Sequence, residues 1–87
     1  MIDLIAIKVA GDRILDLGFA DGSAGRWSAD AILARDTVLT RPLEDAAYFA
    51  SAFIEAGALA WPNGLEFSGA SLHAKMEAAG SLIRKAA

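Results

Sequence analysis

The run Trp61-Pro62-Asn63-Gly64 constrains the fold more than any other part of this chain. Trp61 is large enough to fill the centre of a small core, and Pro62 cannot donate a hydrogen bond to a neighbouring strand. Asn63 and Gly64 tolerate positive φ, so the chain can reverse there. The run therefore predicts a strand end, a buried indole ring and a turn, with hairpins before it and a helix after it.

The chain is short, which limits how much core it can bury. Its 87 residues predict one domain over residues 1–87, and the absence of cysteine removes disulfides and thiolate metal sites. A chain of this size buries only about 60–65% of its unfolded surface. Because 55% of the residues are hydrophobic, we expect a homodimer or a small partner protein to cover an apolar patch.

The net charge of −3 argues against direct nucleic-acid binding, since that needs clustered lysine and arginine. It also argues against binding to an anionic membrane surface. No apolar run reaches the roughly 20 residues that span a bilayer, and the first residues lack the basic segment of a secretory signal. We therefore expect a cytoplasmic protein.

Alternating apolar residues predict an antiparallel meander of three strands over about residues 2–9, 13–20 and 23–28. Gly11-Asp12 marks the first reversal, and Asp21-Gly22 is the strongest hairpin signal in the chain.

The apolar stripes predict the register of the first hairpin. A two-residue loop would misalign the stripes, whereas a three-residue loop over 10–12 keeps both on one face. We therefore expect Ile7 opposite Leu15, and Ile5 opposite Leu17.

The apolar stripes also predict the register of the second hairpin. A three-residue loop with Gly22 in the left-handed region sets Leu17 opposite Gly25 and Leu15 opposite Trp27. This register buries Trp27 beside Leu15.

Short helices are expected near residues 29–34 and 43–50, and a second short strand region near 51–61. One helix over 44–55 is the alternative, because its apolar residues also fit helical spacing and alanine favours a helix. The sequence favours a helix followed by a strand without excluding the single helix.

The last strong signal is a C-terminal helix over about residues 69–79, with Gly80 as its stop. Residues 81–87 either continue the helix after a kink or fray. Together these elements predict an α+β fold.

Three parts of the chain are Phe19-Ala20-Asp21-Gly22, Pro42-Leu43 with Phe49, and Trp61-Pro62-Asn63-Gly64-Leu65-Glu66 followed by Leu72. These segments resemble the family of small bacterial domains of unknown function numbered 2442, over roughly residues 5 to 73. The resemblance implies a compact α+β fold with antiparallel strands, and it supplies no catalytic residue. It also implies a partner, since some members are fused to a helix-turn-helix domain or encoded beside another small protein, as in toxin–antitoxin pairs. The chain after Ala74 is too short for a helix-turn-helix, and His73 replaces a tyrosine common in the family.

His73 is the only histidine. As a general base it would need an orienting carboxylate, for which Glu77 is one turn away, but the same pair offers only two metal ligands. We expect a surface histidine paired weakly with Glu77. The sequence therefore predicts no catalytic residue, no metal site and no cofactor.

The sequence is compatible with two functions. The first is a small protein-interaction or regulatory module, which we expect not to be an enzyme. The alternative is a small-ligand-binding protein or enzyme that uses a groove near Trp61. The candidate groove residues, for a ligand or for a partner, are Trp61, Pro62, Asn63, Gly64, Glu66 and His73.

Overall fold

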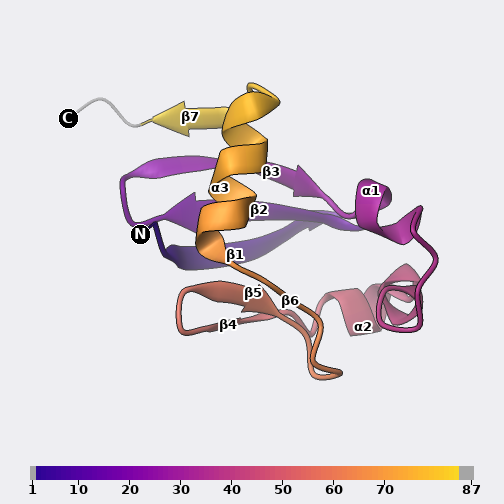
Figure 1. Cartoon of the computed structure of the whole chain (residues 1–87). Coiled ribbons are helices and arrows are strands. Elements are labelled where there is room, and N and C mark those ends of the chain that lie inside the picture. The colour runs from indigo at the N-terminus through magenta and orange to yellow at the C-terminus, as the bar shows by residue number, and fades with distance from the viewer. Residues whose placement is uncertain (1, 85–87) are drawn as a thin grey trace.

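The computed structural model describes residues 2–84, which form an α+β fold with two antiparallel sheets (Figure 1). The larger sheet has the strand order β1-β2-β3-β7, and the smaller has the order β4-β5-β6. Helix α3 crosses one face of the larger sheet (Figure 1). In chain order the elements are β1 (Leu4–Gly11), β2 (Ile14–Phe19), β3 (Ser23–Ser28), α1 (Asp30–Leu33), the 3₁₀ helix η1 (Arg41–Glu44), α2 (Ala46–Phe49), β4 (Phe53–Glu55), β5 (Ala58–Ala60), β6 (Glu66–Phe67), α3 (Gly69–Ala78) and β7 (Leu82–Arg84).

The meander of β1, β2 and β3 is confirmed, but the expected register of its first hairpin is wrong. Ile7 lies opposite Leu17, not Leu15. The ladder shifts between Val9 and Gly11, and the turn uses Arg13 at a φ of 56°. The bulge thus changes the register while keeping the apolar side chains of both strands on one face.

A second bulge moves Ile5 out of the expected stripe. Leu4 lies opposite Phe19 and Ala6 opposite Gly18, so Ile5 has no direct partner on β2. Ile5 is 62% exposed, whereas Leu4 is buried in the core. Because of this bulge, Leu4 enters the interior and the adjacent Ile5 does not.

The expected register of the second hairpin is confirmed. Leu15 pairs with Trp27 and Leu17 with Gly25, and Gly22 has a φ of 86°. Glycine fits this left-handed position without the steric cost that a side chain would add.

The helices near 29–34 and 43–50 are present, and the second is divided by Asp45. The extended Asp45 ends η1 and begins α2, where its Oδ2 accepts a hydrogen bond from the Tyr48 N–H at 3.0 Å. A strand then follows, so the helix-then-strand interpretation is confirmed over the single helix. Ala56 and Gly57, at φ values of 50° and 81°, form the turn between β4 and β5.

The C-terminal helix is confirmed as α3, which Ser68 caps by accepting from the Ser71 N–H at 3.1 Å. Gly80 follows the helix at a φ of 71°. The expectation of a continued helix or a frayed end is wrong for residues 82–84, because β7 pairs there with β3. Residues 85–87 lie outside the described part of the chain.

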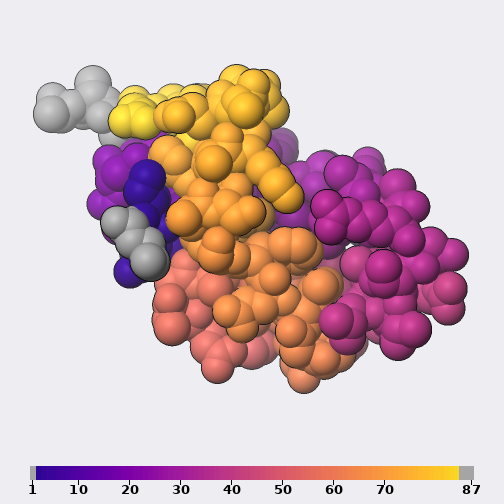
Figure 2. Space-filling model, in the orientation of Figure 1, coloured from indigo at the N-terminus to yellow at the C-terminus, as the bar shows by residue number. Residues whose placement is uncertain are grey.

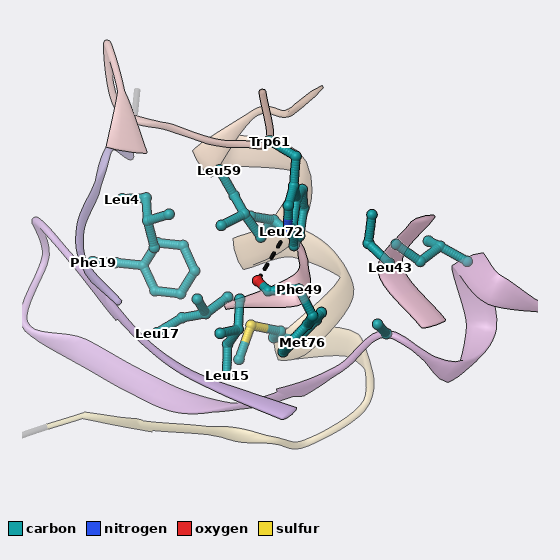
Figure 3. Close-up of a cluster of buried hydrophobic side chains, with 12 residues drawn as sticks. Leu4, Leu15, Leu17, Phe19, Leu43, Phe49, Leu59, Trp61, Leu72 and Met76 are labelled. Carbon is teal, nitrogen blue, oxygen red and sulfur yellow. Dashed lines mark hydrogen bonds between the residues drawn. The ribbon is translucent and has the colours of Figure 1, made fainter. Parts of the chain in front are cut away.

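The core lies between the larger sheet, α3 and the smaller sheet (Figure 3). Trp61 fills its centre, and its Nε1–H donates a hydrogen bond to the Phe49 carbonyl oxygen at 3.1 Å. This bond satisfies the one polar group of the indole ring inside an apolar interior. The buried cluster also includes Leu4, Leu15, Leu17, Phe19, Ala29, Ile32, Leu43, Leu59, Leu72 and Met76.

Candidate functional site

Trp61 is a structural residue. Its side chain is 1% exposed, and its ring packs against Phe49 and Phe67 at centroid distances of 5.9 and 6.3 Å. A ring enclosed in this way presents no surface to a ligand or to a partner.

The turn after Trp61 forms hydrogen bonds with segments that lie far away in the sequence. The Asn63 backbone N–H donates to the Tyr48 hydroxyl at 2.9 Å, and its side-chain amide donates to the Leu39 carbonyl at 3.1 Å. Gly64 takes a φ of 94°, and its N–H donates to the Trp61 carbonyl at 3.1 Å. Pro62 is exposed within this turn. The turn residues therefore have a defined structural role.

The six candidate groove residues do not share a hollow. Glu66 is the only one that lines any of three hollows found within residues 2–84. That hollow has a volume of about 230 Å³ and lies beside Asp3, Gly57 and Gly69. His73 lies elsewhere, against the meander.

The expectation that His73 is a surface residue paired with Glu77 is wrong. Its ring is buried, with Nε2 2.9 Å from Oδ2 of Asp21 and an edge-to-face contact with Phe19 at 5.2 Å. Glu77 instead bonds the Arg84 guanidinium at 2.9 Å. One sequence signal pointed this way, because His73 falls on the buried helical stripe that contains Leu72 and Met76.

The Asp21 carboxylate accepts hydrogen bonds from three groups. The Ser23 hydroxyl and the Ser23 backbone N–H both donate to its Oδ1, and His73 reaches its Oδ2. These hydrogen bonds, chiefly those from Ser23, lower the pKa of Asp21 from 3.8 to about 2. Because the carboxylate is ionised at neutral pH and can only accept, Nε2 of His73 carries the proton of this bond.

A groove lies between β3, α1 and α3, visible in Figure 2 as the recess between α3 and the magenta segment that holds α1. It has a volume of about 270 Å³. Buried Ile32, Leu72 and Met76 contribute to its lining, as do the half-buried rings of Trp27 and Phe67. The groove is therefore a largely apolar concave site of the kind that binds small ligands.

The opposite face of the larger sheet is uncovered by any helix within residues 2–84 (Figure 1). Paired residues form a row of small side chains across it, Ala6, Gly18 and Ala24, which ends at Ile83. Ile83 is 75% exposed and borders a hollow of about 470 Å³. We call these four residues the outer row.

A row of charges crosses the same face beside the outer row. Lys8 pairs with Asp16, and Asp16 with Arg26, across the strands. The Arg26 Nε–H donates to Asp16 at 3.0 Å, which lowers the pKa of Asp16 and raises that of Arg26. The face thus carries an apolar row and a row of alternating charge.

No cluster of three or more metal-ligating side chains occurs within residues 2–84. None of the helices in that range has the length and apolar character needed to cross a membrane. Comparisons of the chain with models of protein families, with curated proteins and with solved structures found no match.

Proposed function

We propose that this chain is a small protein-interaction module, and that its open sheet face joins two copies into a homodimer. The observation that carries the proposal is the self-complementarity of that face. A regulatory role with a further small protein, in the cytoplasm, belongs to the same proposal and is supported by the resemblance described above.

The outer row complements itself under two-fold symmetry. Consider two stacked sheets with a two-fold axis between them, parallel to the strands and midway between β2 and β3. The axis sets β1 of one copy over β7 of the other, so the exposed Ile83 side chain faces Ala6. Gly18 likewise faces Ala24, and these small residues allow a close approach of the two sheets.

The same axis also matches the charges. Because β2 of one copy lies over β3 of the other, each Asp16 faces Arg26 of the second copy. The two intramolecular pairs then form one network of four charges. Such charge matching gives orientation and specificity to an interface more than it gives affinity.

Light scattering coupled to size-exclusion chromatography tests the proposal. We expect the wild-type chain to elute as a dimer at high micromolar concentration and Ile83→Asp to elute as a monomer. Val38→Asp is the matched control, because Val38 is 79% exposed but lies in the segment between α1 and η1. It should leave the dimer intact.

Charge reversal tests the orientation. Asp16→Arg and Arg26→Asp should each weaken the dimer, since each places like charges face to face. The double variant restores both pairs and should restore the dimer. A wild-type monomer at every concentration, or a dimer that survives Ile83→Asp and both single reversals, would overturn the proposal.

A further inference from the structure

We propose that the groove between β3, α1 and α3 binds a small organic anion with a flat apolar body, such as an aromatic carboxylate. This site lies on the α3 side of the larger sheet, whereas the proposed dimer face is on the opposite side, and Arg26 borders both. The inference rests on the shape, the apolar lining and the charges of the groove.

The lining suits an aromatic body. The Trp27 and Phe67 rings lie 6.0 Å apart between centroids and are tilted by 54°. Side chains of Leu72 and Met76 supply apolar surface from α3. A fused bicyclic ring fits a volume of about 270 Å³ and would find both aromatic and aliphatic contacts there.

The charges select an anion. Arg35, which follows α1, and Lys75 on α3 both line the groove, and no aspartate or glutamate of residues 2–84 does so. Neither cation forms an ion pair with any residue in that range. This local excess of positive charge contrasts with the net charge of −3 of the whole chain. Arg26 also lines the groove, but its guanidinium is engaged by Asp16.

The two indole groups provide a direct readout. Trp27 lines the groove, whereas the Trp61 Nε1–H is buried and bonded to the Phe49 carbonyl. Titration with naphthalene-2-carboxylate, followed by proton–nitrogen NMR, should shift the Trp27 indole signal in a saturable way and move that of Trp61 less. We expect a dissociation constant of roughly 0.1–1 mM, typical of so small a ligand.

Two reference compounds separate charge from shape. The neutral naphthalene-2-carboxamide should bind about tenfold more weakly, because it loses the charge-assisted hydrogen bonds. Acetate, which keeps the charge without the ring, should produce no saturable shift of Trp27 in the same range.

Variants locate the site. Arg35→Gln and Lys75→Gln should each weaken binding of the carboxylate about threefold to fivefold, as expected of exposed cations. Lys8→Gln is the matched control, because Lys8 lies on β1 away from the groove and also lacks an ion pair within residues 2–84. Ser71→Phe should block the groove, and it should keep the cap of α3 because only the Ser71 backbone N–H takes part in it.

The titrations can support the proposed site or contradict it. Saturable binding that is lost in Ser71→Phe and weakened in both charge variants supports the site. The inference fails if the carboxamide binds as tightly as the carboxylate, if Ser71→Phe binds unchanged, or if no saturable shift is seen. Each of these results leaves the dimer measurement unaffected.

Discussion

A single hydrogen bond ties the second hairpin to α3. Asp21 closes the turn between β2 and β3, and His73 lies 52 residues further along the chain. The ring is buried, so its Nε2 depends on this carboxylate for a hydrogen-bond partner. The sequence indicated the role of Asp21 in the turn, but not this contact, because a sequence pattern relates neighbouring residues and not residues so far apart along the chain.

Replacing Asp21 with asparagine should weaken the acid dependence of stability. The pKa of Asp21 is depressed on folding, so its ionised form stabilises the native state above pH 4. That contribution is lost as the pH falls from about 4 to about 2. We expect the free energy of unfolding in urea, measured against pH, to fall less steeply in Asp21→Asn over this interval.

Asp12→Asn is the control for this measurement. Asp12 also lies in a hairpin turn, but its side chain forms no hydrogen bond or ion pair with any residue within 2–84. It should keep the wild-type pH profile. Equal slopes for Asp21→Asn and wild type would show that Asp21 contributes nothing to acid stability.

The sequence predicted the positions of the strands and helices along the chain better than it predicted the register of the strands. Turn residues and alternation located the meander, the hairpin turn at Asp21-Gly22 and α3. The bulges near Ile5 and Ala10 were not predicted, because one extra residue in a strand changes the register without changing the hydrophobic pattern around it. Strand β7 was not predicted, because its partner β3 lies far away in the sequence.

Gly69 allows three elements to meet at the start of α3. A Cβ placed there would lie 2.5 Å from the Ile2 carbonyl oxygen, 2.7 Å from that of Gly57 and 2.8 Å from the Leu4 nitrogen. All three are backbone atoms that cannot rotate away. We expect Gly69→Ala to destabilise the fold by about 3 kcal/mol, the upper end of the usual cost of overpacking.

Gly64→Ala is the matched comparison for Gly69→Ala. Gly64 has a φ of 94°, and apart from its two chain neighbours no residue of 2–84 has an atom within 4 Å of the added Cβ, so backbone strain opposes the change. Chemical denaturation should show a loss of about 1 kcal/mol. Equal losses in the two variants would contradict the steric account of Gly69.

The whole molecule is elongated, with principal extents of 40 × 24 × 19 Å. Helix α3 and the smaller sheet cover one face of the larger sheet, which leaves its outer row open (Figure 1). Residue patterns indicated that an apolar surface would need a partner, but they could not place it. Its position depends on β7, which adds Ile83 to the row of small residues.

If two copies cover this face, the thermal stability of the chain must depend on its concentration. Dimerisation stabilises the folded form by mass action, so the melting temperature should rise by about 3–5 °C for each tenfold increase in protein concentration. Differential scanning calorimetry over two decades of concentration measures this directly. Ile83→Asp should remove the dependence and Val38→Asp should retain it. A wild-type melting temperature that stays constant over this range would mean that the open sheet face is stable in water without a second copy.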